Sequence, residues 1–211
     1  ITSAPDLNIH TKKINKFNKS TYISSSLSEK RFLPSAGLDQ KITLGWTGTF
    51  TTFKYFQLIE PVLKRVQDDF DIKITVIGNF EYQSKTLDMH VMQWNPESEI
   101  EDLATFDIGL YPLNNSEWVG GKSGLKAIQY MAMGIPFVAS NLGINSQLFP
   151  DGQVGFLVAS DQEWYNRLAE LINDSVLRRD MGINARMHFL NNYSQEHTSV
   201  KYLSILSEEV K

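Results

Sequence analysis

The sequence predicts an α/β fold in which a parallel sheet is sandwiched by helices and followed by a helical C-terminal tail. From Lys41 onward, short apolar runs alternate with amphipathic stretches of helical period. Glycine or proline stops most of the runs, as at Gly48, Gly78 and Pro112. Strand–helix alternation of this kind is typical of a parallel sheet that is covered on both faces.

The apolar runs predict strands over residues 42–46, 73–78, 87–94, 106–111, 136–140 and 154–158. The first helix follows from one apolar stripe, in which Pro61 should kink the helix or delay its regular part. The members of that stripe are Phe56, Ile59, Leu63, Val66 and Phe70. A short helix is expected over residues 98–104.

Three helices close the chain, and each has a predicted N-cap. Ser160 and Glu163 form a capping box, Asp174 or Ser175 caps a helix that runs to about Asn191, and Ser194 caps the last helix. The last helix should have an apolar face made of Leu203, Leu206 and Val210.

The composition excludes several classes of function. The 211 residues contain no cysteine, which removes disulfides, zinc–thiolate sites and cysteine nucleophiles, and fits a reducing, cytoplasmic compartment. The net charge of −4 gives no indication of nucleic-acid binding. The longest apolar stretch, residues 131–139, is too short to span a bilayer, and no signal peptide is evident.

Residues 1–40 show no sustained period and are rich in Ser, Thr, Asn and Lys. We expect them to be an interdomain linker or the remnant of a missing N-terminal domain, ahead of one domain over residues 41–211. Their lysines could contact an anionic surface, but a solvated linker is the simpler interpretation. These lysines are Lys12, Lys13, Lys16 and Lys19.

Ligands of open parallel sheets bind beyond the carboxyl ends of the strands. This rule selects the loops 47–53, 78–85, 94–98 and 112–123. The last loop leads into a predicted helix that starts near Lys122. Because a helix N-terminus favours anions, we expect a phosphate site there.

The spacing of that helix predicts two faces. Lys122, Lys126, Gln129 and Met133 recur at helical spacing on one face, and Leu125, Ile128 and Ala132 form an apolar face for the sheet. A diphosphate near the lysines and a hydroxyl-bearing group near Gln129 would fit this spacing. A solvent-facing stripe of ordinary lysines is the alternative.

The segment GKSGLKAIQYMAMGIPFVAS resembles the donor-side motif of the retaining group 1 glycosyltransferases, whose GT-B architecture has two facing Rossmann-like domains. The segments KITLGWTGTF, FDIGLYPL and DGQVGFLV are similar to further segments of the same family. The resemblance covers about residues 41–211. It implies one half of a GT-B fold, the donor-binding domain, with the N-terminal acceptor domain missing.

The resemblance also implies a site. The donor diphosphate would lie on Gly48, Thr49, Lys122, Ser123, Gly124 and Lys126. The ribose or sugar would meet Gln129, Glu117 and Gly121. Gln129 stands where the family has its second glutamate, and Gly121 where it has the first, so Glu117 is the candidate substitute. Thr49 and Lys54 stand where the family often has Arg and Lys.

The expected activity is metal-independent transfer of a sugar from a nucleotide sugar, with retention of configuration, in polysaccharide biosynthesis. The nucleotide sugar is a substrate, so no cofactor is expected, and no catalytic residue is identified in this chain. Peripheral association of the full-length protein with the inner membrane surface is a further expectation. The alternatives are a nucleotide-sugar epimerase or phosphorylase of the same architecture, and a non-catalytic interaction domain.

The sequence contains two other candidate signals. Asp69 and Asp71 have the D-x-D spacing of a metal site, but they fall at the amino edge of the predicted sheet, where a solvated turn is favoured. Trp94 ends a predicted strand at the functional edge, where it could flank a nucleotide base or simply pack.

Overall fold

The computed structural model describes residues 1–14, 20–34, 41–116 and 119–209. Its centre is a six-stranded sheet with the order β3-β2-β1-β4-β5-β6, in which every neighbouring pair is parallel. This confirms the predicted Rossmann-like fold. The strands are β1 (Ile42–Gly48), β2 (Ile72–Gly78), β3 (His90–Gln93), β4 (Ile108–Tyr111), β5 (Phe137–Ser140) and β6 (Phe156–Val158).

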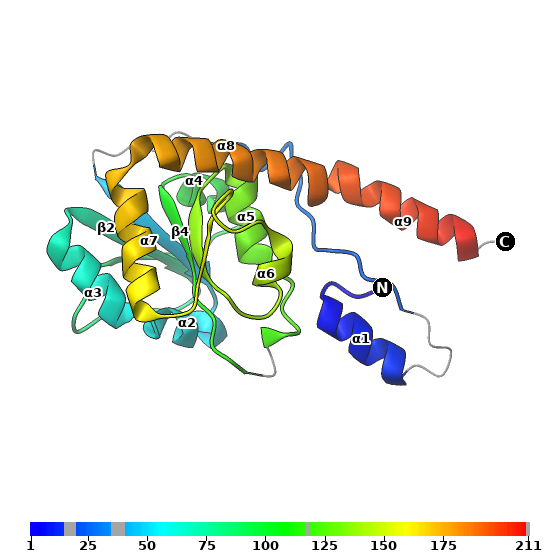
Figure 1. Cartoon of the computed structure of the whole chain (residues 1–211), viewed down its shortest axis with the longest axis horizontal. Helices are drawn as coiled ribbons and strands as arrows, with labels where there is room; N and C mark the ends of the chain where they lie inside the picture. The colour runs from blue at the N-terminus through cyan, green and yellow to red at the C-terminus, as the bar shows by residue number, and fades with distance from the viewer. Residues whose placement is uncertain (15–19, 35–40, 117–118, 210–211) are drawn as a thin grey trace.

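Helices cover both faces of this sheet (Figure 1). Helices α2, α3 and α7 cover one face, and α4 and α5 cover the other. Helix α8 crosses the end of the sheet and continues into α9. The helices are α1 (Pro5–Ile14), α2 (Phe50–Gln57), α3 (Glu60–Asp69), α4 (Glu99–Leu103), α5 (Leu125–Met133), α6 (Asn145–Leu148), α7 (Asp161–Asn173), α8 (Ser175–Asn192) and α9 (Gln195–Glu209).

Alternate residues of each strand supply two separate cores. Ile108 and Leu110 face the core that includes α2, α3 and α7, whereas Tyr111 faces the core that includes α5 and α8. Period-two alternation of side chains produces this division. The central strands are therefore rich in apolar residues on both faces, which is why the sequence pattern located them.

Tyr130 of α5 fixes this helix against the middle of the sheet. The buried phenol lies 3.3 Å from the carbonyl oxygen of Gly45 and 3.1 Å from that of Leu110. The ring lies directly against Gly109, where an added Cβ would come within 2.6 Å of the Tyr130 ring. A glycine at position 109 thus lets α5 approach β4 closely enough to set the position of its N-terminus.

The structure corrects several predicted boundaries. The stripe from Phe56 to Phe70 belongs to two helices, α2 and α3. The helix is interrupted at Leu58 and Ile59, and Pro61 lies in the first turn of α3. Strand β3 has only four residues, which is shorter than the predicted 87–94. Helix α6 and helix α1 have no counterpart in the sequence prediction.

The three predicted N-caps are confirmed, but the reciprocal bond of the predicted capping box falls on the residue before the N-cap. The Ser160 hydroxyl accepts from the Glu163 amide at 3.3 Å, and the Glu163 carboxylate accepts in turn from the Ala159 amide. Asp174 accepts from the Leu177 amide at 2.8 Å, and Ser194 accepts from the His197 amide at 3.1 Å.

The last helix leaves its apolar residues in solvent. Leu203 and Leu206 are 66% and 57% exposed, and Val210 lies outside the described residues. Over the described residues, no helix is long and apolar enough to cross a membrane.

Residues 20–34 run along the domain as an extended segment before β1 begins (Figure 1). Arg186 of α8 fastens this segment, since its guanidinium donates to the carbonyl oxygens of Glu29 and Phe32. The same guanidinium donates to the carbonyl oxygen of Ala132 in the last turn of α5. One side chain therefore connects α5, α8 and the preceding segment.

Candidate functional site

A cavity of about 770 Å³ opens at the carboxyl edge of the sheet. The loops after β1, β2, β3 and β4 all reach it, as expected for an open parallel sheet. The residues that line it come from α1, from β1, α2 and the turn between them, from the turns after β2 and β3, from α4 and β4, and from α5 with the turn before it. They are Leu7, Thr47, Gly48, Thr49, Thr52, Asn79, Trp94, Glu99, Tyr111, Gly121, Lys122, Ser123, Gly124, Leu125, Lys126 and Gln129.

The N-terminus of α5 lies in this cavity without a side-chain cap. Its N-cap residue is Gly124, which has no side chain that could accept from the first amides of the helix. By contrast, Ser160 and Asp174 cap α7 and α8 with their side chains. The first turn of a helix has amides without intrahelical partners, so α5 presents its own to the cavity.

Gly124 is required at this turn for two reasons. Its φ of 72° lies in the left-handed region, which L side chains rarely adopt. An added Cβ would also come within 2.0 Å of Leu148 Cδ1 of α6. The prediction that α5 begins near Lys122 is therefore wrong: the helix begins at Leu125, and Lys122 and Ser123 belong to the turn before it.

The predicted faces of α5 are also corrected. Leu125, expected on the apolar face, is 42% exposed, and Met133, expected on the polar face, is buried. The reason is that α5 packs against the sheet on one side and against α8 on another, so every residue from Ala127 to Met133 is buried. Only the first turn and Gln129 keep the predicted polar character.

Two lysines flank the uncapped helix end. The Lys122 ammonium lies 5.2 Å from the centre of the Tyr55 ring. The Lys126 ammonium lies 5.4 Å from the ring centre of Trp46 and 5.7 Å from that of Tyr111. Within the described part of the chain, neither lysine has a carboxylate within ion-pair distance. Their positive charges are thus held by aromatic faces and are available to an anion.

Burial, and to a smaller extent the neighbouring charge of Lys122, lowers the pKa of Lys126 to about 8. Burial also raises the pKa of Tyr111, so this phenol stays neutral beside the lysine. An ammonium that is poorly solvated and lacks an anionic partner would gain most from a bound anion.

The turn after β1 forms the opposite wall of the cavity, and Gly48 and Thr49 lie there as predicted. The Thr49 amide donates to the Thr52 hydroxyl at 3.0 Å. The Phe50 amide donates to the Asn79 side-chain oxygen at 3.0 Å, which ties the β1 turn to the β2 turn. These bonds fix the backbone of the turn across the cavity from α5.

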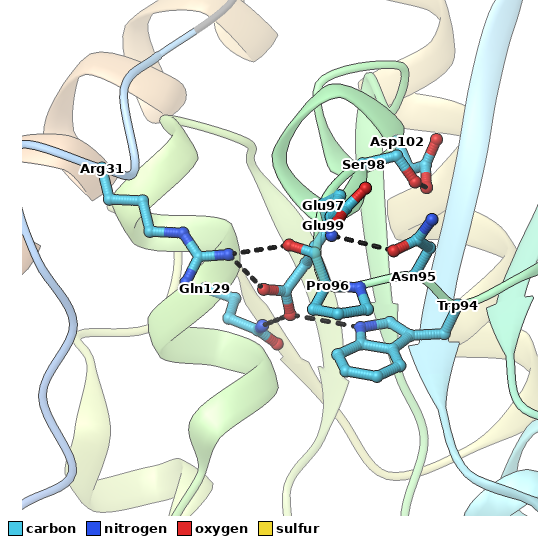
Figure 2. Close-up of polar contacts among 9 residues, drawn as sticks. All are labelled: Arg31, Trp94, Asn95, Pro96, Glu97, Ser98, Glu99, Asp102 and Gln129. Carbon is cyan, nitrogen blue, oxygen red and sulfur yellow. Dashed lines mark hydrogen bonds and ion pairs between the residues drawn. The ribbon is translucent and has the colours of Figure 1, made fainter.

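Gln129 lies one helical turn beyond Lys126, and its amide meets a carboxylate that the sequence did not predict. Gln129 Nε2 donates to Glu99 Oε1 at 3.2 Å, and Trp94 Nε1 donates to the same oxygen at 3.4 Å (Figure 2). Arg31 Nη2 lies 3.4 Å from Glu99 Oε2 and 3.1 Å from the Pro96 carbonyl oxygen. No sequence signal connects these residues, which lie on separate elements.

The structure brings most of the predicted site residues into one cavity. The group comprises Gly48, Thr49, Gly121, Lys122, Ser123, Gly124, Lys126 and Gln129. Glu117, the candidate substitute for the first glutamate, lies outside the described residues, as does its neighbour Trp118. Trp46 is a core residue, whereas Trp94 is 45% exposed and lines the cavity.

The D-x-D pair lies at the opposite, amino edge of the sheet, as predicted. Asp69 ends α3 and accepts from the Tyr165 hydroxyl, and Asp71 pairs with Lys41 at 2.5 Å. Across the described ranges, no group of three or more His, Cys, Asp and Glu residues could hold a metal ion.

The parallel sheet and the cationic helix end at its carboxyl edge are typical of Rossmann-like nucleotide-binding domains. A model of the family "Glycosyl transferases group 1" matches residues 41–174. The chain therefore belongs to the group 1 glycosyltransferases.

Curated relatives agree with this membership. The chain is 26% identical over 140 residues to a D-inositol 3-phosphate glycosyltransferase of Paenarthrobacter aurescens (strain TC1), covering 60% of this chain and 34% of the relative. A protein of the same name from Arthrobacter sp. (strain FB24) is 27% identical over 143 residues, covering 60% of this chain and 32% of the relative. The chain thus matches about a third of the length of each.

Solved structures show the same fold. A glycosyltransferase from Rickettsia africae ESF-5 superposes with a TM-score of 0.78 at 15% identity, over 99% of this chain and 62% of that one. Anabaena Alr3699/HepE in complex with UDP and glucose superposes with a TM-score of 0.80 at 12% identity, over 98% of this chain and 62% of that one. The fold is therefore the Rossmann-like half of a GT-B glycosyltransferase.

Proposed function

We propose that this domain binds a nucleotide-sugar donor for retaining, metal-independent transfer of the sugar to an acceptor held by a second domain. The observation that carries the proposal is the uncapped N-terminus of α5, which lies in the cavity between Lys122 and Lys126. The solved complex of Anabaena Alr3699/HepE with UDP-glucose supports the class of ligand. The family membership supports the reaction type.

The chemical task of such a site is to stabilise the leaving diphosphate. When the bond between the anomeric carbon and the diphosphate oxygen breaks, negative charge grows on that oxygen. Lys122, Lys126 and the first amides of α5 are already oriented towards the cavity, so little reorganisation is needed as the charge develops. Two ammonium groups in this position are the reason for proposing that no divalent ion is required.

The rest of the nucleotide would lie along the carboxyl ends of β2 and β3. A volume of about 770 Å³ is in the range of pockets that enclose ligands of this size. The exposed ring of Trp94 offers an apolar face against which a base could stack.

Titration with UDP, GDP and ADP, followed by amide NMR, tests the proposed site. Amides of residues 121–126 should shift, and Lys122→Ala should weaken binding by about 1.5–3 kcal/mol, the range of a charged hydrogen bond. Lys64→Ala is the matched control, because Lys64 is a surface residue of α3 paired with Asp68. Absence of any shift at millimolar nucleotide, or equal affinity of the two variants, would remove the diphosphate from this site.

Metal independence has its own test. Binding of the preferred nucleotide should be the same in EDTA and in Mg²⁺ or Mn²⁺, and Asp69→Ala should bind as the wild type does. Binding that needs a divalent ion and is lost in Asp69→Ala would contradict the proposal.

Retention needs a longer protein that contains this domain together with an acceptor-binding domain. The anomeric configuration of its product should equal that of the donor, and the NMR coupling constant between the anomeric carbon and its proton gives this configuration. An inverted product would refute retention, and an epimerised or phosphorolysed sugar would identify one of the alternative reactions.

A further inference from the structure

The cavity contains a carboxylate that the family resemblance does not account for. Glu99 is the first residue of α4, and its side chain is 18% exposed at the cavity wall. Residue 129, where the resemblance places a glutamate, is a glutamine whose amide points at Glu99 (Figure 2). In this chain the carboxylate at this wall of the cavity therefore belongs to α4.

Three donors from three elements hold Glu99 in place. Gln129 of α5 and Trp94 at the end of β3 donate to Oε1, and Arg31 of the preceding segment donates to Oε2 (Figure 2). Arg31 also donates to the Pro96 carbonyl oxygen, so the loop that carries Glu99 is fixed as well. A side chain with so many partners has one orientation, which is what a recognition group needs.

These bonds leave acceptor capacity for a ligand. A carboxylate offers about four lone-pair positions, and the three donors leave Oε2 with only one partner. Hydrogen bonds from hydroxyls to a carboxylate are among the stronger neutral-to-charged pairs in proteins. One acceptor position therefore remains on Oε2, and a ribose hydroxyl of a nucleotide in the cavity could donate to it.

The identity of residue 129 follows from the same geometry. Gln129 Nε2 lies 3.2 Å from Glu99 Oε1, so a glutamate at position 129 would bring two carboxylates into contact. Like charges at this distance disfavour ionisation of both groups. An amide donates a hydrogen bond instead, so Gln129 supports the Glu99 carboxylate where a glutamate would repel it.

We propose that Glu99 accepts a hydrogen bond from the ribose diol of the donor nucleotide and that Gln129 is its positioning residue. This inference rests on the proposed function, since it requires a nucleotide in the cavity. It assigns ribose recognition to α4 and gives the glutamine of α5 a supporting role.

The test compares UDP with 2′,3′-dideoxyuridine diphosphate, which lacks the diol, by calorimetry on the same domain. If ADP or GDP binds better than UDP, that nucleotide is compared with its own 2′,3′-dideoxy analogue. The wild type should prefer the diol by about tenfold or more, and Glu99→Gln should reduce that preference to about twofold. Glu97→Gln, an exposed carboxylate two residues earlier, is the control and should keep the full preference.

The variant Gln129→Glu gives a second, opposite expectation. Although it restores the family's residue, it should weaken UDP binding by about tenfold, and the double exchange Glu99→Gln/Gln129→Glu should recover most of the loss. Thermal unfolding of each variant shows that it is folded. Tighter UDP binding by Gln129→Glu alone would overturn the inference.

The two levels of the proposal fail in different ways. If the wild type binds neither UDP, ADP nor GDP, the proposed function fails, and the assignment of Glu99 with it. If the wild type binds UDP but Glu99→Gln weakens both ligands by the same factor, Glu99 only supports the loop, and this inference alone is wrong.

Discussion

The ammonium of Lys126 lies 5.4 Å from the centre of the Trp46 ring, a fully buried tryptophan of β1. The charge thus lies at the boundary between the core and the cavity at the carboxyl edge of the sheet, with aromatic rings rather than water around much of it. Such a position weakens the folded state while no anion is bound, and it strengthens the attraction to an anion.

Replacing this lysine should separate stability from binding. We expect Lys126→Met to raise the free energy of unfolding by about 1–3 kcal/mol, because methionine fills the same space without a buried charge. Nucleotide affinity should fall at the same time. Urea unfolding and calorimetry measure the two effects, and Lys64→Met, on the exposed surface of α3, should change neither. A less stable Lys126→Met variant would show that the charge of Lys126 does not destabilise the folded state.

The pKa of Lys126 also predicts a pH dependence of stability. The folded pKa is about 8, below the ordinary value of 10.5, so between these values the unfolded chain binds more protons. Stability should therefore rise with pH from about 8 to about 10.5, relative to Lys126→Met, in which this contribution is absent. Urea unfolding at several pH values gives the difference, and parallel curves for the two proteins would contradict the assigned pKa.

Nucleotide binding should be linked to the same proton. A bound diphosphate favours the ammonium, so binding near pH 8 should take up a fraction of a proton, and affinity should fall as the pH rises above 8. Calorimetry in two buffers of different ionisation heat measures the uptake. Lys126→Met should show less uptake than the wild type, and an equal value would place the proton elsewhere.

The turn before α5 should not tolerate a side chain. Gly124→Ala places a Cβ at a φ of 72° and within 2.0 Å of Leu148 Cδ1. Gly152 is the matched control, since its φ is 75° but the nearest heavy atom to an added Cβ is 4.0 Å away. We expect Gly152→Ala to lose about 1 kcal/mol of stability from backbone strain and Gly124→Ala clearly more. Equal losses in thermal or urea unfolding would show that Leu148 moves aside freely.

Arg186 should hold the segment before β1 against the domain. Its guanidinium donates to the carbonyl oxygens of Glu29, Phe32 and Ala132, and Arg186→Met removes all three bonds. We expect a loss of about 2–4 kcal/mol and faster proteolysis within residues 20–34. Arg179→Met, on the exposed side of α8, should behave as the wild type. Unchanged proteolysis would mean that the segment is held by other contacts.

The strands and caps could be predicted because they depend on local pattern. Residues 106–111 are mostly apolar and are followed by Pro112, and Ser160 and Glu163 are spaced as a capping box, so neither pattern needs tertiary information. Helix α1 could not be predicted, because its ten residues are mostly polar and none is buried. The start of α5 was misplaced because the left-handed turn at Gly124 is a property of the backbone that the letters GKSG do not specify.

The site was predictable where one segment supplies it and hidden where distant segments meet. Lys122, Gly124 and Lys126 are neighbours in sequence, so helix geometry was enough to group them. Glu99 and Gln129 are 30 positions apart and meet only because α4 and α5 cover the same face of the sheet. Arg31 is 68 positions from Glu99.

Helix α5 has no side-chain cap, and this leaves its first turn structurally incomplete. Helices α7 and α8 complete their first turns with their own side chains, but α5 leaves that part of its structure to be supplied from outside. A phosphate group that occupies the turn would act as the absent capping residue. If the proposed donor binds there, its diphosphate would be a temporary component of the architecture, and the first turn of the helix would be complete only while the donor is bound.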